Sequence, residues 1–319
     1  MNLKIINGFS NLLWLWTLII IPIALFSPLT LLSFKCVIKP MLGSVILAMG
    51  LTLSISNFRE VFKRPFLVIL GLISQYSIMP IAGLFVGIIF FKVSKIFSSE
   101  YIAGQILTGS CPTGVVSNVY NFLAQANVAL SICLSAINTF LAPFLTPFIT
   151  RVLAGKFIHV DILKLFIDMI EVTLLPVLIG LIINTYFPDK IKKIKSFFPI
   201  YSTISVVIII GYVVAAGRLK ILHLGIIQVL LLVLGSIVHL MIGYVLGFSI
   251  AKLFRLNNFN SVTISIETAM QNSGLATVLA LSQWGPISAL PAIIYSVVQN
   301  IIGPFVCNFF NIKIVKYGS

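Results

Sequence analysis

A polar stretch interrupts an apolar region near the end of this chain, where Thr263 to Thr277 read TISIETAMQNSGLAT. Glu267, Gln271 and Asn272 fall within six residues there. A carboxylate at the centre of a bilayer costs on the order of 3 kcal/mol or more, so Glu267 is a candidate functional residue. The nearest preceding cation, Arg255, lies outside the stretch. A bound cation is therefore the expected partner of Glu267; the alternative is a protonated Glu267 held by hydrogen bonds in a helix interface.

A second polar stretch, Gly109 to Ser131, reads GSCPTGVVSNVYNFLAQANVALS. Pro112 has no backbone N–H to donate and Gly114 relaxes the backbone, so the pattern predicts that a helix unwinds just before Ser117 and Asn118. Unwound backbone at membrane depth must be buried in protein or line a water-filled cavity, where its carbonyls become available as ligands. Together with hydroxyl, amide and carboxylate oxygens, such carbonyls suit a small hard cation.

Membrane-spanning helices must position these groups. Of the 319 residues, 59% are hydrophobic and 9% are charged, against about 25% charged in an ordinary soluble domain. Spanning a bilayer takes about 20 mostly apolar residues. The sequence therefore predicts an all-α polytopic membrane protein with about ten spans, at approximately 10-33, 40-57, 66-91, 101-122, 127-150, 162-187, 198-216, 222-249, 258-283 and 286-311.

The two polar stretches fall in the fourth and ninth spans, and the ninth is expected to break at Asn272, Ser273 and Gly274. The chain also repeats itself. A Gly-x3-Gly-x4-Lys pattern recurs after 160 residues, at Gly83, Gly87 and Lys92 and again at Gly243, Gly247 and Lys252. Three further pairs are displaced by similar amounts: Pro28 and Pro188 by 160, Asn118 and Asn272 by 154, and Pro143 and Pro304 by 161.

These matches predict a duplication of five helices, with repeats at 1-155 and 156-319. Because five is odd, the second repeat must enter the membrane from the opposite side, which gives the inverted repeats of secondary transporters. In that architecture the substrate and ion sites lie near the midplane, on helices broken in corresponding places. The paired glycines are expected to let the third and eighth helices approach their neighbours closely.

The net charge of +14 does not indicate nucleic-acid binding, because no basic run is interleaved with exposed aromatic residues. The Lys and Arg residues fall instead in short loops, where they set topology. The side of the N-terminus holds twelve of the 21 and the other side nine, which favours cytoplasmic termini in a bacterial-type inner (plasma) membrane. The twelve are Lys4, Arg59, Lys63, Arg64, Lys190, Lys192, Lys193, Lys195, Lys252, Arg255, Lys313 and Lys316.

Neither zinc nor enzyme chemistry is indicated. The four cysteines have no C-x-x-C spacing and are expected to be buried small apolar residues. The chain lacks H-E-x-x-H and G-x-S-x-G, and its three histidines are not spaced as a catalytic cluster. His239 is either a hydrogen-bonded structural residue or a group that titrates or touches substrate. Asp168 and Glu171 are expected to face water or Lys164 rather than to form a proton-sensing pair.

The two polar stretches, together with ILAMGLTLSISNFREVFKRP at Ile46 to Pro65, resemble the bile acid:sodium symporter family. The patterns Pro-x-Gly-x-x-Ser-Asn and Glu-x-x-Met-Gln-Asn-Ser-Gly carry the resemblance, which covers nearly the whole chain. It implies a core of helices three to five and eight to ten (about 66-150 and 222-311). It also implies a panel of helices one, two, six and seven (about 10-57 and 162-216), discontinuous crossing helices four and nine, and two sodium sites behind the crossover.

Carried over by residue, the resemblance places one Na⁺ at Ser117, Asn118, Ser131, Ser135 and Glu267. It places the other at Gln75, Glu267 and Gln271 and the carbonyls of Thr268 and Met270. The substrate's polar end is expected near Thr113, Asn118, Asn272, Gln299 and Asn300. Relatives often have Cys-Pro-Gly-Gly-Thr where this chain has Cys-Pro-Thr-Gly-Val at 111-115, and threonine is common at the position of Ser135. The sodium sites look intact, whereas the substrate contacts differ.

The sequence thus predicts a sodium-coupled symporter of organic monoanions that works by alternating access. Two Na⁺, the Glu267 carboxylate and a monoanion sum to zero charge, which a low-dielectric site tolerates. A bile-acid-like steroid and a small acid such as pantoate or ketopantoate both remain open as cargo, and we favour the small acid. The alternative is a proton-coupled organic anion transporter or a metalloid exporter on the same fold. Membrane lipid is the other expected contact, and no protein partner is implied.

Overall fold

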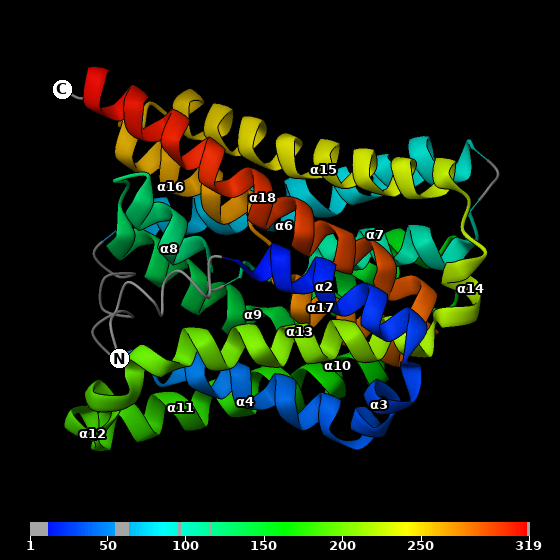
Figure 1. Cartoon of the computed structure of the whole chain (residues 1–319). Coiled ribbons are helices and arrows are strands. Elements are labelled where there is room, and N and C mark those ends of the chain that lie inside the picture. Colours follow the sequence, from blue (N-terminus) through cyan, green and yellow to red (C-terminus); the bar gives the residue numbers. More distant parts are fainter. Residues whose placement is uncertain (1–11, 55–63, 95–96, 115, 318–319) are drawn as a thin grey trace.

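A computed structural model describes residues 12–54, 64–94, 97–114 and 116–317, and these residues form helices and no strand (Figure 1). Lys4, Arg59 and Lys63 of the topology prediction lie outside them. Seven apolar helical stretches are long enough to cross a membrane: Pro28–Gly50, Pro65–Lys92, Val128–Ala154, Ile162–Tyr186, Pro188–Ala216, Ile226–Leu253 and Pro286–Ile312. The protein is therefore polytopic and helical in the part that the structure describes.

Most of these stretches are composite. The second helix consists of α3 (Pro28–Leu32), a 3-10 turn and α4 (Ile38–Gly50), and the third of α6 (Pro65–Val86) and a π turn to Lys92. Further along are α9 (Val128–Ala154), α10 (Ile162–Met169) continuing through a π turn into α11 (Leu175–Tyr186), and α12 (Pro188–Ile194) leading through a 3-10 turn into α13 (Phe198–Ala216). The short α14 (Arg218–Leu222) precedes α15 (Ile226–Leu253), and α18 (Pro286–Tyr317) ends the described chain.

Predicted helix boundaries were wrong at two prolines, Pro28 and Pro188. The first apolar helix, α2 (Leu13–Phe26), ends before residue 33, and Pro28 begins the next helix instead of closing the first. Pro188 likewise begins α12, so the seventh helix starts ten residues before the predicted 198 and includes the lysine cluster. The physical reason is the same in both places. Proline has a helical φ and lacks only an N–H that the first turn leaves unpaired, so it starts helices more readily than it ends them.

Four shorter helices hold most of the two polar stretches: α7 (Ser99–Ser110), α8 (Val116–Leu123), α16 (Asn258–Ala269) and α17 (Ser273–Trp284). Every residue from Tyr101 to Ser110 and from Asn260 to Ala269 is buried. These segments are therefore enclosed by other helices on all sides. Their polar residues face protein, which explains how an apolar protein accommodates them.

The two breaks lie against each other. Pro112 disfavours a helical conformation at Cys111, which is extended, and α7 ends there. Thr113 forms an isolated antiparallel bridge with Gln271, flanked by hydrogen bonds from Gly114 N to the Met270 carbonyl (3.0 Å) and from Asn272 N to the Pro112 carbonyl (2.9 Å). Each break thus satisfies the other's backbone groups.

The first break falls where the sequence predicted it, and the second is displaced slightly toward the N-terminus. Helix α16 ends at Ala269, and Met270 is extended. Asn272 caps α17, its side chain accepting a hydrogen bond from Leu275 N at 3.1 Å. Ser273 and Gly274, which we expected to be unwound, already belong to α17. The cap explains the difference, because an Asn side chain stabilises a helix start immediately after itself.

Paired glycines set the packing of α7 and α16, the helices that precede the two breaks. A Cβ atom at Gly83 would lie 2.8 Å from the Gln105 carbonyl oxygen, so α6 approaches α7 closely. A Cβ atom at Gly243 would lie 2.8 Å from the Cα atom of Ala269, so α15 approaches α16 equally closely. The predicted close approach of the third and eighth helices is confirmed.

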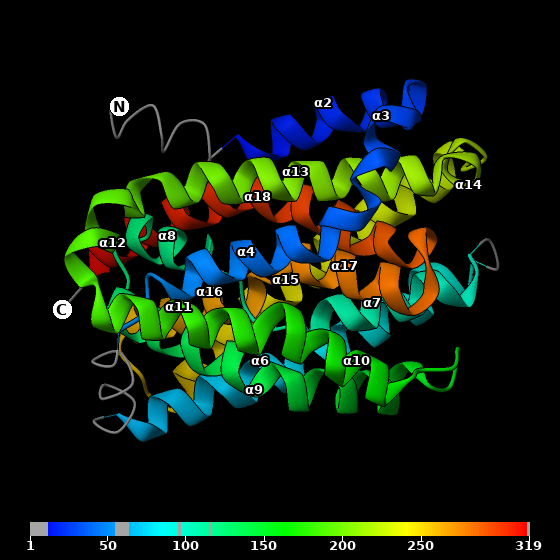
Figure 2. The ribbon, with the colours of Figure 1, turned by 90° about the horizontal axis from the view of Figure 1, so that it is seen from below.

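The longer helices form two packed groups. Helix α13 contacts α2 and α4, and α11 contacts α4. Helix α15 contacts α6, α16 and α18, while α7 contacts α6 and α18. Figures 1 and 2 show α4, α11 and α13 side by side, and α12 at the opposite end of the molecule from α3 and α14. The short helices lie between these two groups, where α17 contacts both α4 and α18.

Candidate ion and substrate site

Glu267 lies in the last turn of α16 and is 2% exposed. Its carboxylate accepts hydrogen bonds from Ser131 Oγ (2.6 Å), Ser135 Oγ (3.0 Å) and Asn121 Nδ2 (3.2 Å). No Lys, Arg or His among the described residues forms an ion pair with it. Within the described chain, the carboxylate is thus buried in a nest of neutral polar groups without a protein cation.

All five residues predicted for the first sodium site come together, from α8, α9 and α16. Ser131 Oγ lies 2.6 Å from Asn118 Oδ1 as well as 2.6 Å from Glu267 Oε1. Ser117 Oγ lies 3.4 Å from Ser135 Oγ. Hydroxyl, amide and carboxylate oxygens make up this cluster, and oxygen donors are what a hard cation prefers. The donor set therefore fits Na⁺.

Gln75 and Gln271, predicted for the second site, form a reciprocal amide pair with Nε2 to Oε1 distances of 2.8 and 3.1 Å. Gln75 also donates to the Cys111 carbonyl (2.9 Å), and Gln271 to the Thr268 carbonyl (2.8 Å). No hydrogen bond within the described chain joins either side chain to Glu267. Gln271 instead bonds the Thr268 carbonyl, one residue after Glu267 on α16.

The Met270 carbonyl, also predicted for the second site, accepts two hydrogen bonds. One comes from Gly114 N (3.0 Å) and the other from Thr113 Oγ1 (2.9 Å). Thr113 itself is 1% exposed. Thr113, one of the residues that differ from those common in the family, thus bonds the other broken stretch directly.

Sequence reasoning missed Asn121. This side chain is fully buried, and its Nδ2 bonds the Ser117 carbonyl (3.0 Å), Ser131 Oγ (3.0 Å) and Glu267. Its Oδ1 is buried without a hydrogen-bond partner among the described residues. The available signal was spacing, because residues four apart on a helix share a face and Asn121 follows Ser117 by four. Asn121 thus belongs to the same cluster of polar groups around Glu267.

A cavity of about 280 Å³ lies beside the crossing breaks. Asn272, Gln299 and Asn300, predicted to meet the substrate, line it, whereas Thr113 and Asn118 do not. Residues of α4 and α13, including Ala48 and Ser202, form the facing wall. The lining is mainly apolar.

Lys195 is the one charged residue among the described residues that line this cavity. It is exposed, in the 3-10 turn between α12 and α13, so the cavity reaches solvent at that end. The sequence analysis counted Lys195 only as a topology signal. Lys195 lies at the mouth because residues 188–216 form one continuous helical stretch. The predicted span began at 198 and so left Lys195 in a loop.

Gln299 ties the second break to α18. Its Oε1 accepts from Gln271 N (3.1 Å), and its Nε2 donates to the Gln271 carbonyl and to Ser273 Oγ (both 3.1 Å). Asn300 Oδ1 accepts from Tyr120 OH on α8 at 3.3 Å. These two neighbours therefore connect both broken stretches to the cavity wall.

Two polar residues take structural positions. His239 is fully buried, with Nε2 2.9 Å from the Met79 carbonyl oxygen and Nδ1 2.6 Å from Gln105 Nε2, and it does not line the cavity.

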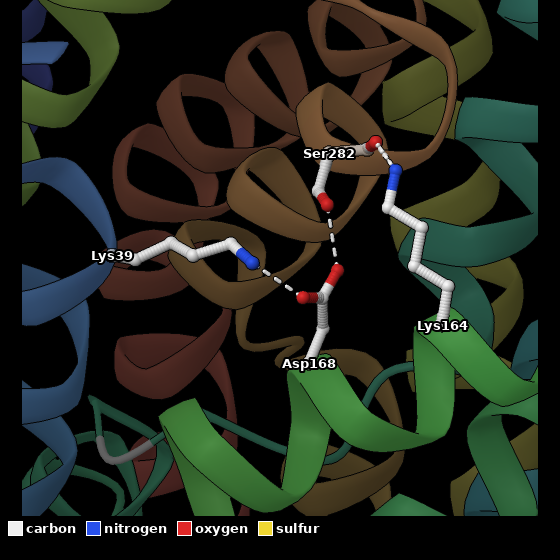
Figure 3. A network of polar contacts seen from close by, with 4 residues as sticks. All are labelled: Lys39, Lys164, Asp168 and Ser282. Carbon is white, nitrogen blue, oxygen red and sulfur yellow. Dashed lines mark hydrogen bonds and ion pairs between the residues drawn. The ribbon is translucent and has the colours of Figure 1, made fainter. Parts of the chain in front are cut away.

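Asp168 does not face water as expected. It is 4% exposed and pairs with Lys39, while Ser282 bonds its other oxygen (Figure 3). Only Glu171 of the two carboxylates is exposed. Helix packing reverses the expectation, because α17 covers the face of α10 that carries Asp168.

Residues 39–224 match the Sodium Bile acid symporter family. The uncharacterized sodium-dependent transporter YocS of Bacillus subtilis (strain 168) is 37% identical over 275 residues, which cover 86% of this chain and 83% of that protein. The probable chloroplastic sodium/metabolite cotransporters BASS1 of Arabidopsis thaliana and of Oryza sativa subsp. japonica are 36% and 34% identical over 81% of this chain. The chain spans 62% and 61% of those two plant proteins.

The matched proteins are transporters, and the seven apolar helices are those of an integral membrane protein. The expectation of a transporter rather than an enzyme is confirmed. The resemblance stated from the two polar stretches is confirmed as well: the chain belongs to the Sodium Bile acid symporter family.

Proposed function

We propose that this protein is a sodium-coupled symporter of a small organic monoanion and works by alternating access. The observation that carries the proposal is Glu267, a buried carboxylate that bonds three neutral donors and no cation of the described residues. An unpaired buried charge is strongly destabilising, so a site of this kind is completed by a cation from solution. The names of the matched relatives, an uncharacterized sodium-dependent transporter and a probable sodium/metabolite cotransporter, support sodium as that cation.

Two ion positions fit the donors. The first Na⁺ is bound by Ser117, Asn118, Ser131, Ser135 and Glu267, whose oxygens already form one cluster. The second is bound by Gln75, Gln271, Glu267 and the carbonyls of Thr268 and Met270. Because the Met270 carbonyl accepts from both Gly114 and Thr113, an ion there competes with the Thr113 hydroxyl for it. We therefore assign Thr113 to the second ion site rather than to the substrate.

The proposed membrane architecture has ten crossings. The seven long helices supply seven, α2 is a shorter apolar helix, and the pairs α7/α8 and α16/α17 supply two discontinuous crossings. Corresponding helices begin at similar displacements: α6 and α15 by 161 residues, α7 and α16 by 159, and α9 and α18 by 158. This spacing supports two inverted repeats, 1-155 and 156-319, with both termini cytoplasmic in a bacterial-type inner membrane.

Within this architecture the core comprises α6 to α9 and α15 to α18, and the panel comprises α2 to α4 and α10 to α13. The cavity lies between the two, with α4 and α13 on one side and α8, α17 and α18 on the other. Movement of the core against the panel then exposes the breaks to one side of the membrane at a time.

The cavity supports a small acid as cargo. Its volume of about 280 Å³ is at the lower end of the range for small-molecule sites, roughly 300 Å³ upward. A compact acid such as pantoate or ketopantoate suits that space better than a four-ring steroid. The start of α17, capped by Asn272, presents the positive end of a helix to an anion, and Lys195 supplies a charge of the same sign at the mouth.

The test measures the melting temperature of the detergent-purified protein while Na⁺ replaces K⁺ at constant ionic strength. A ligand at about 100 times its Kd that binds only the folded state stabilises it by about 2.7 kcal/mol. We expect Na⁺ to raise the melting temperature of the wild type and not of Glu267→Gln. Glu171→Gln, the same substitution at an exposed carboxylate in the π turn that precedes α11, is the matched control and keeps the response.

The proposal would be refuted if Na⁺ did not raise the melting temperature of the wild type. If pH rather than Na⁺ changes the melting temperature of the wild type, and the melting temperature of Glu267→Gln does not respond to pH, then Glu267 carries a proton and the proton-coupled alternative holds. The metalloid exporter has no comparable support, because Cys111 is buried and is absent from the cavity lining.

A further inference from the structure

A four-residue polar cluster joins three helices away from the cavity, and we call it the Asp168 latch (Figure 3). Lys39 Nζ of α4 forms an ion pair with Asp168 Oδ1 of α10 at 2.5 Å. Ser282 Oγ of α17 donates to Asp168 Oδ2 at 2.6 Å, and Lys164 Nζ of α10 donates to the Ser282 carbonyl at 2.5 Å. Ser282 is thus held on both its hydroxyl and its carbonyl.

The latch lies at the end of the molecule opposite the cavity mouth. The cavity lining runs along α4 from Thr52, just after the helix, to Leu42, and Lys39 lies three residues beyond Leu42, about 4.5 Å along the helix. On α17 the lining ends at Gly274, and Ser282 follows Gly274 by eight residues, about 12 Å. The described cavity reaches neither Lys39 nor Ser282. The structure is therefore open at the Lys195 end and shut at the latch end.

We propose that the Asp168 latch holds the core to the panel and keeps the transport path closed on the side opposite the cavity mouth. The inference rests on the proposed alternating-access function, in which α17 belongs to the core and α4 and α10 to the panel. Both hydrogen bonds of Ser282 cross that boundary. The Lys39–Asp168 ion pair lies within the panel, so it persists when the bonds to Ser282 break.

This division suits a reversible contact. Leaving a buried carboxylate without a cation is expensive, but Asp168 keeps Lys39 when Ser282 moves away. The opening step therefore costs only hydrogen bonds, which water on the newly opened side can replace. A direct ion pair between core and panel would cost more to separate.

The test uses a thiol reporter on each side of the breaks. The background is Cys36→Ser, because Cys36 is the exposed native cysteine and the other three are buried. Val278→Cys, at a position 3% exposed and four residues before Ser282 on α17, is the latch-side reporter, and Thr52→Cys is the cavity reporter. Reaction rates with a polar maleimide are measured in detergent, without Na⁺ or substrate.

On the scale of one hydrogen bond to a charged group, Ser282→Ala is expected to raise the rate at the latch-side reporter about tenfold and to lower the rate at the cavity reporter. Lys164→Gln, which changes an exposed residue and removes the bond to the Ser282 carbonyl, is expected to act in the same direction if Ser282→Ala fails to fold. The matched control is Ser288→Ala. Its hydroxyl bonds Ala280 and Gly285, both within the core, and its loss should leave both rates unchanged.

Two results would overturn the latch. Unchanged rates in Ser282→Ala and Lys164→Gln would show that these bonds do not hold the closed side. A rise at both reporters would show general loosening instead of a shift between two states. Neither result depends on sodium, so failure of the latch is distinguishable from failure of the proposed coupling, which the melting experiment measures.

Discussion

At the residue scale, the polar cluster around Glu267 consists of side chains that satisfy one another's hydrogen bonds. The sequence predicted Glu267 from burial cost alone, and the family resemblance supplied its serine and asparagine neighbours. Asn121 was not predicted because an Asn on a short helix is usually a surface residue, and its role depends on which face of α8 turns inward. That face is set by the packing of α8 against α9 and α16.

We expect Asn121→Ala to lower stability by about 2 kcal/mol, because the change leaves Glu267 Oε1 and Ser131 Oγ with one donor fewer. It should also weaken stabilisation by Na⁺, since Asn121 is part of the same cluster and supplies a buried Oδ1 with no partner among the described residues. The control is Asn138→Ala, a second buried Asn whose side-chain atoms have no hydrogen-bond partner there. Melting curves with and without Na⁺ decide the matter. An unchanged sodium response in Asn121→Ala would place Asn121 outside the ion site.

At the scale of elements, proline and glycine made much of the fold predictable. Pro112 located the first break, and the repeated glycines located the close packing of α6 on α7 and of α15 on α16. The second break was less well located because it contains no proline. Its position depends on the bridge between Thr113 and Gln271, a contact between segments 158 residues apart that no local pattern encodes.

Gly243→Ala tests whether this packing positions Glu267. The new Cβ would lie 2.8 Å from Ala269 Cα, where backbone must move, and overpacking of this kind costs about 1 to 3 kcal/mol. We expect a lower melting temperature and a smaller sodium response, because α16 carries both Ala269 and Glu267. Gly43→Ala is the control, since its Cβ would meet only the Pro176 ring at an ordinary 3.6 Å. Equal behaviour of the two variants would show that α16 tolerates the shift.

At the scale of the whole molecule, charge is distributed unevenly around one cavity. The sequence showed a strongly basic chain with lysines in loops, and the positive-inside rule accounted for them as topology signals. Only the three-dimensional arrangement separates Lys195 from its neighbours, because it lines the cavity and Lys193 does not. In our proposal the same residue both sets topology and attracts an anion.

Lys195→Gln should therefore raise the apparent KM for pantoate about two- to fivefold in proteoliposomes, which is the scale of one exposed ion pair. Exposed charges are screened within about 10 Å at 0.1 M salt, so the wild-type KM should rise when choline chloride is added at fixed Na⁺. The KM of Lys195→Gln should respond less. Lys193→Gln removes the same charge two residues away, outside the cavity lining, and should resemble the wild type. If both variants raise the KM equally, diffuse surface charge attracts the anion and Lys195 has no particular part in selecting it.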